Sequence, residues 1–276
     1  MISMNASGVI PRDTIVRRIK DSLEPLPFVR AYWEGGAIGY GALDEWSDLD
    51  LYVVADDEKV EEAFVAVENA LSSLSPIKQK YDIGKTGMQG VFQAFYKLRD
   101  ASEFHLIDLA VLQASAPDKY LEPIVHGQAV FYFNKDAGMT VPKLDRDALV
   151  QRLTLRLERL EARMAMFGTF IHKEMNRRNY IEAVDLYRVV LIDSIVELLR
   201  IQHHPPHHDF KMRYIHRELP PGDVKKLQEL SFVKDESDLE AKIALASDWF
   251  QEILGQIKTT GIADLVDGAL SKASRP

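Results

Sequence analysis

Hydrophobic positions follow two different spacings along this chain. In the first half, short apolar runs bounded by glycine, proline and acidic clusters predict β-strands. These strands are expected over residues 28–33, 49–55, 87–98, 104–112 and 128–134. Apolar residues that recur every three or four positions predict helices over residues 11–23 and 56–71, each with one face buried against a sheet.

The second half has the spacing of helices alone. From residue 145 onward, leucine-rich stripes predict helices over residues 145–170, 180–201, 221–230 and 237–257, with another after residue 260. The spacing of apolar residues changes from that of strands to that of helices near Pro142. The pattern therefore predicts an α+β protein. A domain over residues 1–142 has a mixed or antiparallel sheet with flanking helices, and residues 143–276 form an α-helical bundle.

Composition narrows the class of protein. A chain of 276 residues is long enough for two domains. The formal net charge of −8 argues against a general nucleic-acid binder, which usually presents a basic face. With no cysteine, the chain forms no disulfide and no zinc–thiolate site. It shows neither a signal-peptide pattern nor a run of about 18 apolar residues, so we expect a cytoplasmic protein that does not bind membranes.

The stretch from residue 33 to residue 55 carries the most distinctive chemistry. Gly35 and Gly36 follow one predicted strand, and Asp48 and Asp50 open the next. Residues two apart on a strand point the same way, so the two carboxylates are expected on one face. A solvated strand edge is the structural alternative. Twin acids beside an apolar core repel each other, however, which favours a bound cation, and hard oxygen ligands suit Mg²⁺.

A third acid interrupts a later strand. Asp108 lies in the apolar run 104–112, where an unpartnered carboxylate is costly to bury. It is expected either to join the acids at residues 48 and 50 or to be satisfied by an arginine or by backbone amides. The glycine-rich turn and these three acids together indicate phosphoryl or nucleotidyl transfer.

These residues also carry a family resemblance. The pair Gly35-Gly36, a spacer of eleven residues and the run Asp48-Leu49-Asp50-Leu51 resemble the signature of the nucleotidyltransferase superfamily, which is DNA polymerase beta-like. Within it, the chain is most similar to bacterial aminoglycoside and lincosamide adenylyltransferases. The resemblance implies Mg²⁺-dependent transfer of a nucleotide, first of all AMP from ATP, to a hydroxyl of a small molecule, with release of pyrophosphate.

The resemblance also implies roles for single residues. Asp48 and Asp50 would be metal ligands, and Asp108 a ligand or the general base, a part that an acid of the helical domain could also play. Gly35, Gly36 and Ser47 would contact the nucleotide, although a turn-stabilising role suits Ser47 equally. Lys211 of the substrate-binding helical domain matches a family lysine near the triphosphate. The alternative to this role is that Lys211 forms an ion pair on the protein surface.

The sequence departs from the family pattern at two positions and leaves other functions open. Glu34 stands where a hydrophobic residue is usual, and Gly36 where serine is common, so the nucleotide would be held by backbone amides. One alternative function is nucleotidyl transfer to a protein or RNA. Another is a non-catalytic, nucleotide-binding regulator of antitoxin type.

The run of histidines from His203 to His208 stands apart from this site. It carries four of the eight histidines in the chain. Adjacent side chains diverge and two prolines stiffen the segment, so a loop is expected rather than a tetrahedral metal site. Adventitious binding of nickel or zinc is the alternative.

Overall fold

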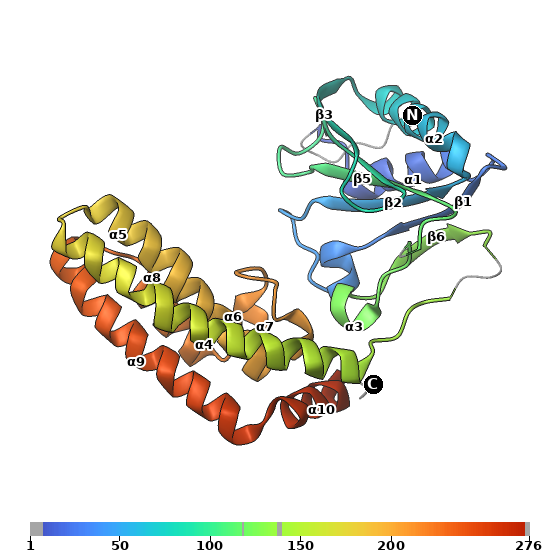
Figure 1. Ribbon diagram of the computed structural model, residues 1–276. Helices are drawn as coiled ribbons and strands as arrows, with labels where there is room; N and C mark the ends of the chain where they lie inside the picture. Colours follow the sequence, from blue (N-terminus) through green and yellow to red (C-terminus); the bar gives the residue numbers. More distant parts are fainter. Residues whose placement is uncertain (1–7, 118, 137–139, 274–276) are drawn as a thin grey trace. The chain divides into compact units, whose positions relative to one another are not determined.

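The computed structural model describes residues 8–117, 119–136 and 140–273 (Figure 1). The chain separates into two compact units, Met1–Lys143 and Leu144–Pro276. The division lies one residue from the boundary expected at Pro142. Each of the two, unit 1 and unit 2, buries its own hydrophobic cluster.

Unit 1 is built around a mixed sheet. Its described strands are β1 (Val29–Glu34), β2 (Leu49–Ala55), β3 (Ile77–Lys85), β4 (Val91–Leu98), β5 (Ile107–Gln113) and β6 (Val130–Asn134). They lie in the order β3-β4-β5-β2-β1-β6. Strands β2 and β5 run parallel, whereas the other paired strands run antiparallel, including the expected β4–β5 pair. The predicted α+β class is confirmed.

Two helices, α1 (Arg12–Leu23) and α2 (Val60–Leu74), cover one face of this sheet (Figure 1). Leu49, Leu51 and Val53 of β2 are fully buried in the cluster beneath them. Because side chains alternate along a strand, the even-numbered residues of β2 point to the opposite face. A smaller apolar cluster around Trp33 and Tyr120 covers part of that second face.

Strand β3 is missing from the prediction. Its residues are almost all exposed, and the polar run from Lys78 to Lys80 shows no apolar alternation. The strand forms because its backbone pairs with β4, which is a non-local interaction. The short helix α3 (Pro123–His126) was not predicted either. Strands β4 and β5 begin three or four residues later than expected.

Unit 2 is helical. Its described helical segments are α4 (Arg146–Asn176), α5 (Tyr180–Leu186), the π-helical segment η3 (Tyr187–Ile192), α6 (Asp193–His203), the 3-10 turn η4 (Pro205–His207), α7 (Ile215–Glu218), α8 (Pro221–Ser231), α9 (Glu236–Thr260) and α10 (Ile262–Ala273). The prediction had one continuous helix over residues 180–201. The π segment interrupts it and shifts the faces of the helix that follows.

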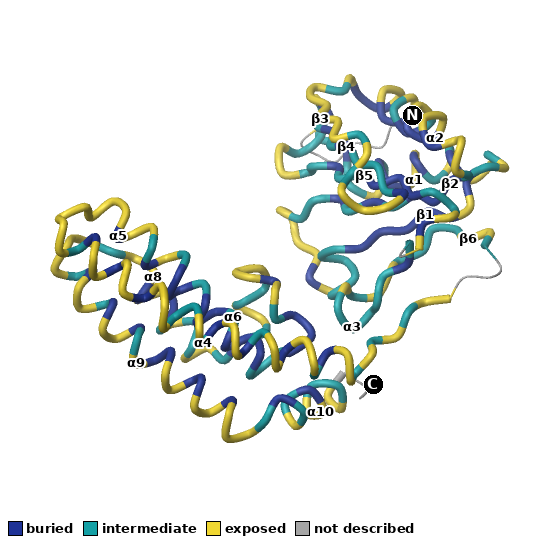
Figure 2. Tube along the Cα trace, viewed as in Figure 1, coloured by how far each residue is buried: buried dark blue, intermediate teal, exposed yellow. Residues whose placement is uncertain are grey.

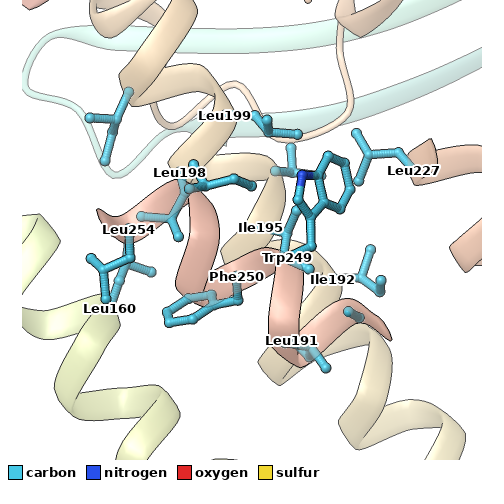
Figure 3. Packing of buried hydrophobic residues seen from close by; sticks show 14 of the residues in the cluster. Leu160, Leu191, Ile192, Ile195, Leu198, Leu199, Leu227, Trp249, Phe250 and Leu254 are labelled. Atoms are coloured by element: carbon cyan, nitrogen blue, oxygen red, sulfur yellow. The ribbon is translucent and has the colours of Figure 1, made fainter. Parts of the chain in front are cut away.

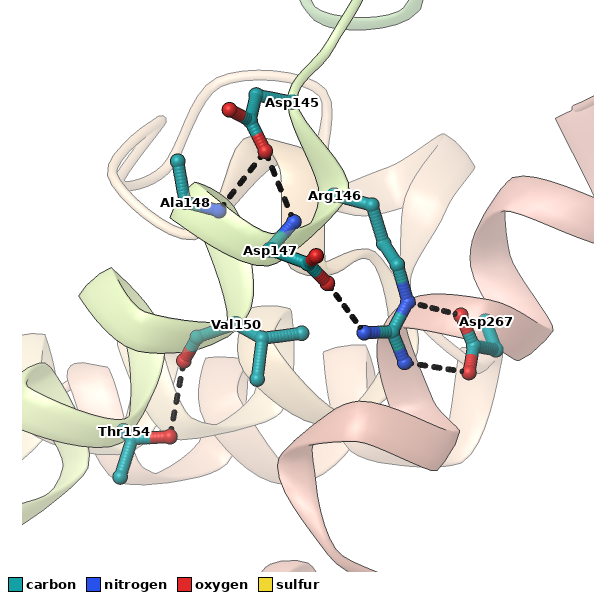
Figure 4. Close-up of polar contacts among 7 residues, drawn as sticks. All are labelled: Asp145, Arg146, Asp147, Ala148, Val150, Thr154 and Asp267. Carbon is teal, nitrogen blue, oxygen red and sulfur yellow. Dashed lines mark hydrogen bonds and ion pairs between the residues drawn. The ribbon is translucent and has the colours of Figure 1, made fainter.

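Local signals fix where α4 begins. Asp145 caps the helix by accepting hydrogen bonds from the backbone amides of Asp147 and Ala148, both at 3.0 Å (Figure 4). Arg146 forms two hydrogen bonds of 2.7 Å with Asp267 of α10. The first turn of α4 is thereby tied to the last helix of the chain.

Leucine-rich stripes form the core of unit 2. Leu160 of α4, Leu198 of α6 and Phe250 of α9 pack together in this core (Figure 3). The buried stripes run along the inner faces of the long helices, and the outer faces are exposed (Figure 2). No described helix is both long and apolar enough to cross a membrane.

Candidate active site

Asp50 and Asp108 stand side by side on neighbouring parallel strands. Asp50 of β2 is the register partner of Asp108 of β5, so the two carboxylates leave the sheet on the same face. This is the face opposite α1 and α2. Asp48 lies two residues before Asp50, just outside the strand. All three acids are partly buried.

Asp108 is held by a neutral partner. The side-chain amide of Gln93 in β4 donates a hydrogen bond of 2.7 Å to Asp108 Oδ1. Burial raises the pKa of Asp108, the Gln93 bond lowers it, and the nearby charge of Asp48 raises it, with a net upward shift. Among the described contacts Asp108 has no arginine partner. Its negative charge is therefore not compensated by an ion pair.

The glycine turn presses against Asp50. The Gly35 amide donates a hydrogen bond of 3.0 Å to the Asp50 carbonyl. Gly36 has a φ of +61°, and a Cβ there would overlap Asp50 Oδ2 and lie 2.6 Å from Asp50 Cγ. The chain then enters a 3-10 turn, Gly36–Tyr40. Any side chain at position 36 would displace the Asp50 carboxylate.

Glu34 has a structural explanation that the sequence did not supply. Its side chain is fully buried and pairs with Arg12 at the start of α1. The hydroxyl of Tyr132 donates a second hydrogen bond to Glu34. Arg12 also reaches the carbonyl of Asp48 at 3.4 Å. Sequence reasoning noted Glu34 only as a departure, and missed Arg12 because its partner lies 22 residues away.

Two further residues were predicted to contact the nucleotide, Ser47 and Lys211. The Ser47 hydroxyl donates to Asp44 Oδ1 at 2.7 Å and accepts a bond of 2.9 Å from the Asp44 amide. The structure therefore shows Ser47 as a turn-stabilising residue. Lys211 belongs to unit 2, where it lines a cavity. The predicted contacts of both residues with a nucleotide stay predictions.

A small hollow of about 190 Å³ opens beside Asp108. Tyr52 and Ala110, from the acid-bearing face of β2 and β5, line it together with Gln93. Thr86 and Met88 supply part of its rim from the β3–β4 connection. Carboxylate oxygens are the ligands that a hard divalent cation prefers, although the ligating atoms of Asp48, Asp50 and Asp108 do not all lie within 4.8 Å of one another.

The histidine run forms a turn and packs into unit 2. His204, His207 and Glu218 each place one metal-ligating atom within 4.8 Å of the others. The rings of His204 and His207, however, are stacked with centroids 4.1 Å apart and 15° between their planes. Glu218 is engaged by His207 at 2.7 Å and by the buried guanidinium of Arg200. A shared metal must lie in both ring planes, which this stacking prevents, so the predicted loop is the better interpretation.

Acidification should destabilise unit 2. Burial lowers the pKa of His204 and of His208 below the ordinary 6.5. A lowered folded-state pKa gives stability that is complete above 6.5 and is lost as the pH falls further. We expect unfolding free energy to fall between pH 7 and pH 5 by up to about 1.4 kcal/mol per pH unit for each histidine. Chemical denaturation at each pH measures it.

The matched control separates these histidines from general acid effects. Replacing His204 and His208 together by Asn should make the pH dependence shallower, and the remainder would come from His203 and His105, whose pKa values burial also lowers. The change His172→Asn, at an exposed position of α4, should leave it as steep as before. An equally steep dependence in the double variant would contradict the assignment.

Comparisons with known proteins give only distant structural likenesses. No family model matches the chain, and no curated protein matches it. An aminoglycoside 6-adenyltransferase from Bacillus subtilis aligns at 12% identity and a TM-score of 0.33, covering 93% of this chain and 90% of its own. A spectinomycin adenyltransferase from Enterococcus faecialis, solved with ATP and spectinomycin, aligns at 14% identity and a TM-score of 0.27, covering 89% and 98%.

Both of these proteins are adenyltransferases, the class of enzyme that the sequence resembles. TM-scores of this size establish neither a common fold over the whole chain nor a common reaction.

Proposed function

We propose that unit 1 is the catalytic domain of a Mg²⁺-dependent nucleotidyltransferase. It would transfer a nucleotide, first of all AMP from ATP, to a hydroxyl of a small molecule. The observation that carries this proposal is the pairing of Asp50 with Asp108 on adjacent parallel strands, with Gly36 packed against the Asp50 carboxylate. Two neighbouring carboxylates on one face have a reason to coexist when a cation lies between them.

The chemistry of the donor atoms suits Mg²⁺. Asp48, Asp50 and Asp108 would supply carboxylate oxygens, the ligands that this hard cation prefers. When bound, Mg²⁺ would neutralise charge on the triphosphate and on the leaving pyrophosphate. The lack of a side chain at Gly36 leaves the Asp50 carboxylate room to take up its position.

Groups of the protein would then accept the proton of the attacking hydroxyl and bind the phosphates. Asp108 has one oxygen engaged by Gln93, so its Oδ2 is the atom to accept a proton from the acceptor hydroxyl. The acceptor oxygen bonds to the α-phosphorus, and the bond from that phosphorus to pyrophosphate breaks. The Gly35 amide is engaged by the Asp50 carbonyl. The backbone amides that begin at Gly36 would therefore contact the phosphates, because the glycine has no side chain to obstruct a close approach.

Unit 2 would bind the acceptor. We keep the prediction that Lys211 contacts the triphosphate, and that an aminoglycoside or a lincosamide is an acceptor to test first. Transfer to a protein or to RNA is the second enzymatic candidate, and the net charge of −8 disfavours RNA.

The decisive test is a pyrophosphate-release screen. The purified protein is incubated with Mg²⁺ and each of the four nucleoside triphosphates, against aminoglycosides, lincosamides, spectinomycin and unrelated hydroxylated metabolites. We expect release that requires both Mg²⁺ and one class of acceptor, with ATP as the preferred donor. Calorimetric binding of ATP without pyrophosphate release across the whole panel would instead favour a non-catalytic, nucleotide-binding protein.

A further inference from the structure

A row of paired side chains crosses the sheet of unit 1 from the acids to an edge strand. Asp50 of β2 is the register partner of Asp108 of β5. Asp108 is also paired with Phe95 of β4, and Phe95 with Tyr81 of β3. Paired residues on neighbouring strands point to the same face, and the strands lie about 4.8 Å apart. Phe95 is therefore one strand from Asp108, and Tyr81 is two.

The adjacent pair of residues shows which face this row occupies. Lys80 and Tyr96 are register partners, and both reach Glu68 of α2. The Tyr96 hydroxyl donates a hydrogen bond of 2.9 Å to Glu68, and the Lys80 ammonium lies 2.8 Å from the same carboxylate. Helix α2 covers the face opposite the acids, so alternation along the strands places Tyr81 and Phe95 on the acid-bearing face.

The two rings form an aromatic surface beside Asp108. Their planes are 19° apart and their centroids 6.1 Å apart. Phe95 is partly buried, whereas Tyr81 is 68% exposed on the edge strand β3. Cross-strand aromatic pairs stabilise a sheet, but this pair also leaves a large ring in water next to the candidate site. Such a ring is suited to stacking on a flat group of a ligand.

The charges around the pair favour an uncharged ring. The other polar side chains that paired positions of β3 and β4 bring to this face are Gln79, Gln93 and Lys97. None of them is acidic, and the Lys97 ammonium would repel a cation. A cationic group would find its partners only among the acids, whose charge bound Mg²⁺ would already neutralise.

The aromatic pair and the glycine turn lie on opposite sides of the acids. Gly35 and Gly36 follow β1, which lies on one side of β2, whereas β4 and β3 lie beyond β5 on the other. In an in-line displacement the attacking hydroxyl and the leaving pyrophosphate lie on opposite sides of the α-phosphorus. With the triphosphate at the glycine turn, the acceptor approaches from the side of Phe95.

We propose that Tyr81 and Phe95 form a stacking surface for an uncharged aromatic ring of the acceptor. The reacting hydroxyl would lie at Asp108 Oδ2, and the ring about one strand spacing away, against the aromatic pair. That the ring belongs to the acceptor rests on the proposed function, whereas the stacking itself can be measured without ATP or Mg²⁺.

Three glycosides that differ in one substituent test the stacking. Binding of phenyl, cyclohexyl and methyl β-D-glucoside to the full chain is read by NMR from the amide signals of β3 and β4, beside spermidine as a polycation. We expect the phenyl compound to bind about tenfold more tightly than the methyl compound and more tightly than the cyclohexyl compound, because only a planar ring stacks. Equal or undetectable binding of the three, or tighter binding of spermidine to these strands, would overturn the proposal.

Variants assign the effect to the two rings. Tyr81→Ala and Phe95→Ala should each abolish the preference for the phenyl compound, and Tyr81→Phe, which keeps the ring, should retain it. Phe232→Ala removes a ring that is 72% exposed in unit 2 and should change nothing. An unchanged preference in both alanine variants of the pair would also overturn the proposal, and the wild-type series decides should either variant unfold.

Kinetics separate this proposal from the proposed function. With the acceptor found in the screen, Tyr81→Ala should raise the KM for the acceptor about tenfold and leave the KM for ATP unchanged. An unchanged KM for the acceptor, or a rise in the KM for ATP alone, would overturn the assignment of the rings to the acceptor. Stacking of phenyl β-D-glucoside without pyrophosphate release from any acceptor would support the aromatic surface and count against the proposed function alone.

Discussion

The change Asp50→Asn should reduce acceptor-dependent pyrophosphate release on the order of 10³-fold. Asparagine keeps the size of the side chain but removes the negative charge that a cation bound at Asp50 and Asp108 requires. Steady-state pyrophosphate assays with the acceptor found in the screen measure the loss. Undiminished activity would remove the basis of the proposed function.

The same variant makes a prediction about stability that activity alone does not. If Asp50 serves a metal site rather than the fold, removal of its charge should cost no stability without metal, so Asp50→Asn should melt at or above the temperature of the wild type in EDTA. Added Mg²⁺ should raise the melting temperature of the wild type and much less that of the variant. The control Asp21→Asn, an exposed acid of α1, should behave as the wild type in both assays. A lower melting temperature in EDTA would mean that Asp50 serves the fold instead.

Local sequence patterns were sufficient to predict most of the architecture. The apolar stripes of α1 and α4 are local signals from which a helix can be predicted directly. Strand β3 was not predicted because its backbone pairing with β4 stabilises it, and its own sequence shows no apolar alternation. The π-helical segment was not predicted because its wider turn barely alters the periodicity of the apolar stripe.

The candidate site was predictable in composition but not in assembly. Alternation along β2 set the face of Asp50, and an acid in an apolar strand drew attention to Asp108. That these two are register partners depends on β5 lying beside β2, which no local pattern encodes. The Arg12–Glu34 ion pair could not be predicted from local sequence either, because its two residues come from different elements, α1 and β1. Sequence reasoning could therefore nominate the acids without showing what holds them.

The change Gly36→Ala should lower the rate of nucleotidyl transfer on the order of 10²-fold, in addition to a loss of stability of about 1–2 kcal/mol. Alanine at φ +61° is strained, and its Cβ would overlap Asp50 Oδ2 and push the carboxylate aside. Gly41 provides a matched control. Its φ is +62°, and a Cβ there would meet nothing within 4 Å.

Gly41→Ala should therefore lose similar stability in denaturant titrations and keep its catalytic rate. The difference between the two variants isolates the contact with Asp50 from the cost of the left-handed backbone. Gly36→Ser carries the idea one step further, because serine offers a phosphate a hydroxyl yet carries the same obstructing Cβ. We expect it to be as slow as Gly36→Ala. A serine variant as active as the wild type would show that the Asp50 carboxylate adjusts freely, and that the glycine at this position is not what sets the geometry of the acids.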